Sequence, residues 1–258
     1  MDHNCIFDII RQKSKGSNLS LIERLEQIRS KAEVYLSNIP IIFPEYTTHD
    51  IRHKDRILKT FCVAVPKALL NALNSYELFF LAAATYLHDI GMSPLDKLND
   101  IDKNLTNEEK RELIRDTHHI RVENYLLKYF EEFGFNNHEA FVTAKICKGH
   151  RKVDLNNSEF DHSFAFDLEK INIPLLAFML RLVDELDLSY VRAPGSQFEN
   201  IPVTNSTSQE EWMKHSSISE VTNVQDGMVI KCSGGTSDPK IFNSIKHTEK
   251  KINTLLNE

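Results

Sequence analysis

The 258-residue sequence has little of what marks a membrane-spanning, secreted or nucleic-acid-binding protein. None of its hydrophobic runs approaches the roughly 18 apolar residues that a transmembrane helix requires, so we expect no membrane association. The N-terminal segment scatters charged residues among apolar ones and lacks the pattern of a secretory signal, so we expect a cytoplasmic protein. The net charge of −6 provides no general attraction to nucleic acid, which is therefore a disfavoured partner.

Cysteines are few and widely spaced. The four of them, Cys5, Cys62, Cys147 and Cys232, form no CxxC pair. Disulfide frameworks and cysteine zinc sites usually show closely spaced cysteines, so the sequence favours neither. We expect four reduced thiols.

Glycine and proline are also scarce, with eight residues of each. Between them, apolar residues recur every three or four positions, which is typical of amphipathic helices and predicts a mainly α fold. One helix should begin at a capping box formed by Thr106 and Glu109. Another should run from Pro174 to a stop at Pro194 and Gly195. The ranges in which we expect helices are 20–39, 66–91, 105–134 and 173–195.

The residue pattern of the sequence changes from helical to β-rich near residue 196. Two β-rich runs, at about 217–224 and 227–232, flank the pair Asp226-Gly227, which is typical of hairpin turns. An amphipathic helix should follow from Lys240. We therefore expect a helical domain over residues 1–195, with its core at about 45–192, and a small α/β tail over residues 196–258.

Ionisable residues occupy unexpected positions on the apolar helices. His88 and Asp89 end the most apolar helix, and Asp184 is aligned with leucines on the apolar side of another. A buried carboxylate needs a compensating charge, which for Asp184 could come from Arg181 one turn earlier or from a metal ion. Arg181 could equally pair with Glu185 at helical spacing.

A third segment, YTTHDIRHKDRILKTF, places His49 and His53 four residues apart, hence on one face if the helix has begun by then. A single histidine or an isolated HD pair is more often structural than metal-binding. Four residues together offer two imidazoles and two carboxylates, a ligand set that suits a divalent transition metal or magnesium. They are His53, His88, Asp89 and Asp184.

The order H…HD…D resembles the HD superfamily of metal-dependent phosphohydrolases. The residues that carry the resemblance lie in IRHKDRI, LHDIGM and RLVDELDLS. It implies an HD-type helical bundle and one or two divalent ions, of Mn, Mg, Fe, Ni, Co or Zn. It also implies attack of a metal-bound water on phosphorus, with Asp89 orienting the nucleophile if two ions bind. The implied metal ligands are His53, His88, Asp89 and Asp184.

Further residues acquire roles through the same resemblance. His118, His119 and His150 resemble the extra histidines of two-metal members, which would hold a second ion. His49 resembles the general acid of class I cyclic-nucleotide phosphodiesterases, although a purely structural role at the helix start is equally open. Met92 stands where many HD enzymes have a phosphate-binding lysine, so other cations would have to bind phosphate. The candidates are Arg52, Arg115, Lys148, Arg151 and Arg192.

The motifs FPEYTTHDIRH, RDTHHIRVE and CKGH, followed by a small α/β tail, resemble a bacterial subgroup of HD domains. Its members occur with Hsp90-like or histidine-kinase-like ATPase domains, which implies a role in stress or conflict systems. The sequence has no glycine-rich ATP site, so such an ATPase partner would be a separate chain or region. A homo-oligomer is a further option.

These observations lead to hydrolysis of a small phosphomonoester or phosphodiester as the leading function, with a nucleotide as the favoured substrate. The alternative is an HD module that binds a nucleotide or a partner without turnover, and whose binding would survive loss of the metal. A nuclease is disfavoured, because the chain is acidic and contains a single tryptophan, whereas proteins that bind single strands use basic grooves and stacking aromatics.

Overall fold

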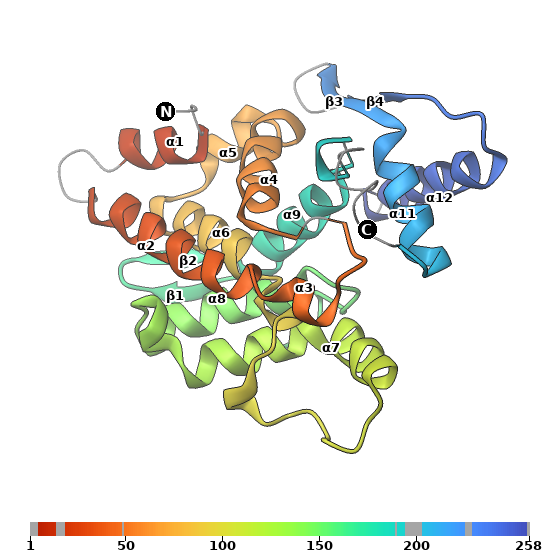
Figure 1. Ribbon diagram of the computed structural model, residues 1–258. Coiled ribbons are helices and arrows are strands. Elements are labelled where there is room, and N and C mark those ends of the chain that lie inside the picture. Colours follow the sequence, from red (N-terminus) through yellow and green to blue (C-terminus); the bar gives the residue numbers. More distant parts are fainter. Residues whose placement is uncertain are drawn as a thin grey trace.

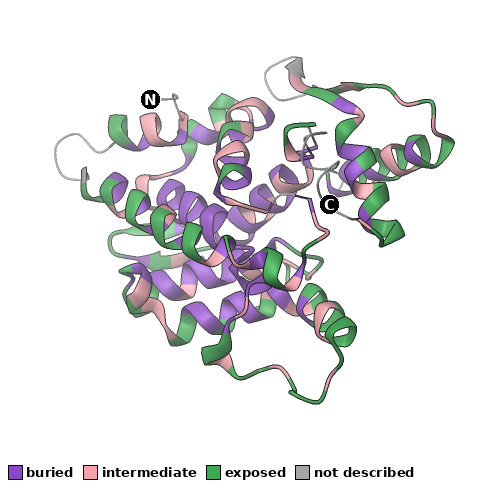
Figure 2. Cartoon of the chain, in the orientation of Figure 1, coloured by how far each residue is buried: buried purple, intermediate pink, exposed green. Residues whose placement is uncertain are grey.

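The most apolar helix of the sequence lies at the centre of the fold. Helix α6 (Ser75–Leu87) begins at a capping box between Asn74 and Glu77 and is buried from Glu77 to its end. Other helices surround it in Figure 1, and Figure 2 shows that their buried faces meet there. They are α1 (Cys5–Lys13), α2 (Leu19–Leu36), α4 (Ile51–Ala64), α8 (Asn137–Gly149) and α9 (Ile173–Glu185).

The computed structural model describes residues 5–13, 19–47, 49–188, 190–193, 203–224 and 229–256. These residues are mainly helical, which confirms the expected fold class. Among the described helices, none combines the length and the apolar character that crossing a membrane requires. The shorter helical elements are α3 (Ile39–Ile42), α5 (Lys67–Ala72), η1 (Ile90–Met92), η2 (Asp96–Leu98), η3 (Phe130–Phe133) and η4 (Tyr190–Arg192).

Helix α7 (Asn107–Lys128) begins at the predicted capping box, with Thr106 and Glu109 bonded to each other's backbone N–H groups. It ends at Lys128 rather than at Gly134. The turn η3 fills the interval, and Gly134 follows with a φ of 71°, which glycine adopts without strain. Two short antiparallel strands that the sequence did not reveal, β1 (Phe164–Phe166) and β2 (Glu169–Ile171), connect α8 to α9.

The break after α6 depends on a close approach of two backbones. The turn η1 packs against α7, and a Cβ atom at Gly91 would lie 2.0 Å from the carbonyl oxygen of His118. Only glycine therefore fits at this position. Arg121 of α7 donates to the Gly91 carbonyl, which further holds the segment after Asp89 against α7.

The C-terminal elements lie beside the helical body in Figure 1. The two predicted strands and the final helix are present as an antiparallel pair, β3 (Ile218–Val224) and β4 (Val229–Gly234), and α12 (Pro239–Leu255). The turn predicted at Asp226-Gly227 lies outside the described residues. A further helix that the sequence did not predict, α11 (Ser206–Ser216), packs against α12.

The expectation of four reduced thiols is wrong, because Cys5 and Cys62 form a disulfide. The two cysteines are 57 residues apart in sequence, yet their Cα atoms lie 6.0 Å apart because α1 packs against α4. Local spacing could not reveal this pair. Cys147 is buried and Cys232 exposed, both as free thiols.

Reduction of this disulfide is expected to lower the free energy of unfolding by about 4 kcal/mol, because a closed loop of this length restricts the unfolded chain. Urea denaturation of the Cys5→Ser variant, compared with the wild type under oxidising conditions, measures the change. Cys232→Ser is the matched control and should leave the midpoint unchanged. Equal midpoints for oxidised wild type and Cys5→Ser would contradict the bond's contribution.

Candidate metal centre

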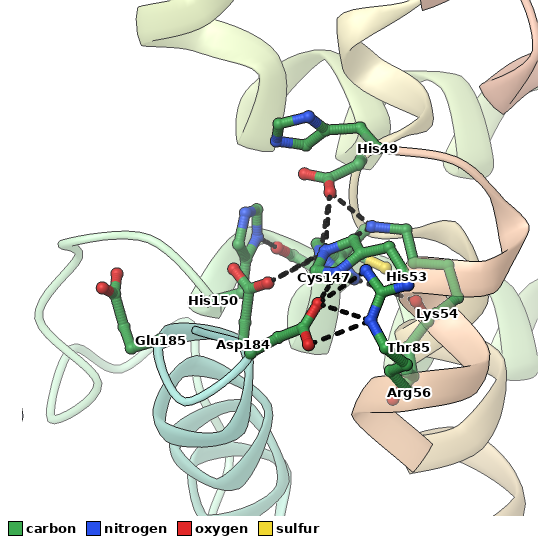
Figure 3. A network of polar contacts seen from close by, with 12 residues as sticks. His49, His53, Lys54, Arg56, Thr85, Cys147, His150, Asp184 and Glu185 are labelled. Atoms are coloured by element: carbon green, nitrogen blue, oxygen red, sulfur yellow. Dashed lines mark hydrogen bonds and ion pairs between the residues drawn. The ribbon is translucent and has the colours of Figure 1, made fainter. Parts of the chain in front are cut away.

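Three helices bring the four predicted ligands together. In the cluster of Figure 3, His53 Nε2 lies 3.3 Å from Asp184 Oδ1 and 3.8 Å from Asp89 Oδ2. His88 Nε2 lies 3.1 Å from Asp89 Oδ2 and 3.8 Å from Asp184 Oδ1. The two imidazoles and two carboxylates therefore face one another around a single point.

Local structure explains how the ligand side chains are directed towards the centre of the cluster. Asp50 caps α4 by accepting hydrogen bonds from the backbone N–H groups of Arg52 and His53, which places His53 in the first turn of the helix. His88 is the C-cap residue of α6, so its side chain extends beyond the end of a buried helix. Asp184 lies in the last turn of α9.

Two expectations about these helices are corrected by the structure. Helix α9 ends at Glu185, well before the predicted stop at Pro194 and Gly195, which themselves lie outside the described residues. Glu185 contacts Lys251 of α12 instead of Arg181, and Figure 3 shows it pointing away from the cluster. Arg181 donates to the backbone carbonyls of Gly149 and Val153.

A second group of ligands adjoins the first. Asp89, His118 and His150 each offer a ligand atom, and these atoms lie within 4.8 Å of one another. Asp89 Oδ1 is 3.8 Å from His118 Nε2, while its Oδ2 faces the first group. The structure does not bring the third predicted histidine, His119, into either group.

The ring nitrogens of these histidines have a common arrangement. In His88, His118 and His150, Nδ1 lies within hydrogen-bond distance of a backbone carbonyl, that of Thr85, Arg115 and Cys147 respectively. In His53, Nδ1 contacts Asp187 Oδ2 at 2.6 Å. Since these oxygens are acceptors, Nδ1 carries a proton, and Nε2 of each ring is directed at the centre. Burial would lower the pKa of His88, but Asp89 raises it above its usual value, so a metal ion would replace a proton on this Nε2.

The same arrangement leaves buried nitrogen and oxygen atoms that a cation would stabilise. His53 Nε2 and Asp184 Oδ1 are buried without a hydrogen-bond partner. His118 Nε2 and His150 Nε2 lie 3.1 Å apart, and two lone pairs at that distance repel unless a positive charge lies beside them. Nitrogen and oxygen donors of this kind fit one or two divalent cations, with Asp89 common to both positions.

Burial and charge keep most of these groups in a metal-binding protonation state. Burial alone would raise the pKa of Asp89, but His88 and Lys54 hold it well below its usual range. Burial lowers the pKa of His118 to about 4, and burial with the neighbouring histidines holds that of His150 well below its usual value. At neutral pH these groups are therefore a carboxylate and two neutral imidazoles.

Comparison with known proteins bears on this arrangement. The model of the HD-CE family matches residues 43–231, well over half of the chain. The chain belongs to the HD-CE family. The matched range contains all the residues of both ligand groups and extends into β4. No curated protein and no solved structure matches this HD-CE chain.

Lys54 of the HD-CE chain is a residue that sequence reasoning missed. It is fully buried, its Nζ lies 3.0 Å from His88 Nε2, and it forms an ion pair with Asp89. An ammonium group thus lies within the ligand cluster. The position of Lys54 directly after His53 did not indicate that it lies in the ligand cluster, because successive residues of a helix point about 100° apart.

Asp187 and Arg56 were missed as well. Arg56 donates to both carboxylate oxygens of Asp187, and Asp187 in turn holds Nδ1 of His53. Carboxylates in this position orient a metal-binding imidazole and increase its basicity. The available signal was an acidic residue three positions after Asp184, because residues at this spacing share one face of a helix.

Replacing Asp187 with asparagine is expected to weaken metal binding by the HD-CE protein about 10- to 100-fold, because His53 loses its anionic partner. Titration with Mn²⁺, followed by calorimetry, measures the change. Asp161→Asn, at an exposed loop position, is the control. An unchanged metal affinity in Asp187→Asn would exclude an orienting role.

The centre opens into a cavity of about 550 Å³ between the helical body and α11 and α12. Arg115 and Arg151, two of the predicted phosphate-binding residues, line it, as does Arg192. Arg52 and Lys148 do not. Arg52 is exposed and paired with Asp50, and Lys148 is paired with Glu159 and Glu123. Met92 is buried against the cavity wall.

His49 lies at the rim of the centre but precedes α4 instead of forming part of it. Its Nδ1 contacts the Thr47 carbonyl at 2.6 Å, and its Nε2 accepts a hydrogen bond from Arg192 at 3.0 Å. Burial and the Arg192 charge lower the pKa of His49 to about 3. In this arrangement His49 is neutral and has no proton on Nε2 to donate, which disfavours the general-acid role in the free protein.

Proposed function

We propose that this HD-CE protein is a metal-dependent phosphohydrolase that cleaves a small phosphomonoester or phosphodiester, with a nucleotide as the favoured substrate. One observation carries the proposal: two ligand groups share Asp89 at the wall of a cavity whose mixed acidic and basic lining includes arginines without a carboxylate partner among the described residues. A bound divalent cation would lower the pKa of a coordinated water and offset the charge that develops on the phosphoryl oxygens.

The chain's own residues have separable tasks in this proposal. His53, His88, Asp89 and Asp184 hold the first ion, and Asp89, His118 and His150 the second. Phosphate oxygens need cations that are not already neutralised. Among the described cations that line the cavity, Arg115, Arg151, Lys152 and Arg192 have no carboxylate partner, whereas Arg111, Lys214 and Lys251 are paired with Glu108, Glu211 and Glu185. Arg115 and Arg151 therefore bind and orient the phosphoryl group.

Metal analysis of the purified protein, followed by a hydrolysis screen on the same sample, tests this function. We expect at least one equivalent of metal, and turnover of a phosphoester with one of Mn, Mg, Ni, Co or Zn. Chelation should abolish the turnover and re-addition of the ion should restore it. Absence of stoichiometric metal even after reconstitution would overturn the proposal.

Lys54 favours a second candidate function. Its ammonium group already occupies the side of Asp89 that faces His88, where it supplies positive charge without a metal. A nucleotide sensor that does not turn over its ligand would need no more than this charge and the cationic cavity. Nucleotide binding that persists in chelator-treated protein, with no hydrolysis under any metal, would support the sensor.

The sequence motifs also support a proposed protein partner, which is the same for either function. The resemblance to bacterial HD domains that occur with Hsp90-like or histidine-kinase-like ATPase domains makes such an ATPase the proposed partner. A pull-down with this chain as bait, analysed for Hsp90-like and histidine-kinase-like ATPases and repeated with and without ATP, tests that partner.

A further inference from the structure

Arg192 is a cation for which the described residues provide no carboxylate partner. Its guanidinium donates to His49 Nε2 at 3.0 Å and to the backbone carbonyl of Asp187 at 3.4 Å, and both acceptors are neutral. Its Nε atom is buried without a hydrogen-bond partner. Arg192 is only partly buried, but a buried N–H group without an acceptor is costly, so the position favours an anionic ligand that would complete its bonding.

His215, which also lines this cavity, has a second unused polar atom. It belongs to α11, only 3% of its surface is exposed, and its Nδ1 has no hydrogen-bond partner. Burial and the charge of Arg192 lower its pKa to about 2, so the imidazole is neutral beside that cation. Its Nε2 lies 3.8 Å from a carboxylate oxygen of Glu211, and the backbone carbonyl of Leu188 also interacts with the ring. A neutral imidazole has a single N–H group, so His215 donates a hydrogen bond to an anion in the tautomer that has this proton on Nδ1.

The wall that carries His215 is held firmly against the helical body. Trp212 Nε1 donates to the Glu45 carbonyl at 2.9 Å, and the Glu45 carboxylate accepts from the backbone N–H groups of Thr204 and Asn205 at 2.8 Å each. His215 follows Trp212 by three residues on the same helix. His215 is therefore held by packed structure in the lining of the cavity that Arg192 also lines.

The pair lies beside the metal centre but is separate from it. Arg192 donates to His49, and the His49 ring centroid is 5.8 Å from that of His53, a proposed metal ligand. A group bound by Arg192 and His215 would thus be a neighbour of the phosphoryl group at the metal centre, within the same cavity.

We propose that Arg192 and His215 form an anion subsite that binds a second phosphate of the substrate, next to the phosphoryl group that reacts. The planar guanidinium matches two phosphate oxygens, and His215 supplies a further donor. This inference rests on the proposed function, because that function places the reacting phosphoryl group at the metal centre. It narrows the substrate to phosphoesters that have a second anionic group, such as nucleoside diphosphates and triphosphates.

Calorimetric titration of chelator-treated protein with inorganic pyrophosphate tests the subsite without requiring catalysis. We expect binding to the wild type, weakened about 10- to 100-fold in Arg192→Gln and about 10-fold in His215→Asn, as expected for lost charge-assisted and neutral hydrogen bonds. Arg52→Gln is the matched control, because Arg52 is exposed and lies outside the cavity. Thermal unfolding confirms that the variants fold, and Arg192→Lys, which keeps the charge, should retain part of the affinity.

Steady-state kinetics of the metal-loaded protein provide an independent measurement. Arg192→Gln should raise KM for a nucleoside diphosphate more than it raises KM for p-nitrophenyl phosphate, which has no second anionic group. Pyrophosphate binding that requires Arg192, in a protein that hydrolyses nothing, would support the subsite while the hydrolase fails. Hydrolysis by a protein that does not bind pyrophosphate, or binds it equally well in Arg192→Gln, would overturn the subsite.

Discussion

Replacement of Asp89 by asparagine is expected to reduce phosphoester hydrolysis by about 10³-fold or more. Asp89 belongs to both ligand groups, with one carboxylate oxygen facing each group. His150 of the second group also lies within reach of His88 and Asp184. The amide keeps the size of the side chain but removes the negative charge that both ions would use. Several kcal/mol of transition-state stabilisation depend on that site, and about 4 kcal/mol corresponds to a 10³-fold change in rate.

Measuring kcat/KM together with metal content separates the origins of this effect. We expect Asp89→Asn to lose metal as well as turnover, while Asp161→Asn retains both. The Asp161 side chain caps a loop by accepting from the backbone N–H of Ser163, and asparagine can preserve this bond. Full turnover in Asp89→Asn would exclude the proposed centre as the site of hydrolysis.

Replacement of Lys54 by methionine is expected to destabilise the metal-free protein by about 3–5 kcal/mol. Lys54 is fully buried and forms an ion pair with Asp89, so its removal leaves the carboxylates of Asp89 and Asp184 with less compensating charge. Breaking a buried pair on one side typically has a cost of this size, because the remaining charge stays out of water.

Urea denaturation with a chelator and with Mn²⁺ tests both the size and the cause of the effect. We expect Mn²⁺ to stabilise Lys54→Met more than the wild type, because the ion replaces the missing ammonium and no longer competes with it for Asp89. Lys103→Met, at an exposed position, should change stability by less than about 0.5 kcal/mol. Equal losses with and without Mn²⁺ would assign Lys54 a purely structural role.

The disulfide and the tail show why some features escaped sequence-based prediction. The Cys5–Cys62 bond depends on how α1 packs against α4, and α11 has a weak helical pattern between polar residues. The end of α9 at Glu185 was also hidden, because its apolar spacing continues into the following segment. Each of these features depends on contacts between distant segments, which local periodicity does not record.

The sequence by itself determined the helical fold class, the central position of α6 and the four residues proposed as ligands of the first ion. Helical periodicity is a local property of the sequence, and the H…HD…D order is a sequence pattern that resembles the HD superfamily. Neither requires coordinates. Only the tertiary structure decided that Asp89 faces two ligand groups, that Lys54 lies inside the cluster and that Asp187 holds His53. It also decided that Arg192 and His215 line the same cavity, while Arg52 and Lys148 stay outside it. These features depend on how side chains from separate helices are placed relative to one another, and the packing of the helices sets the distances between them.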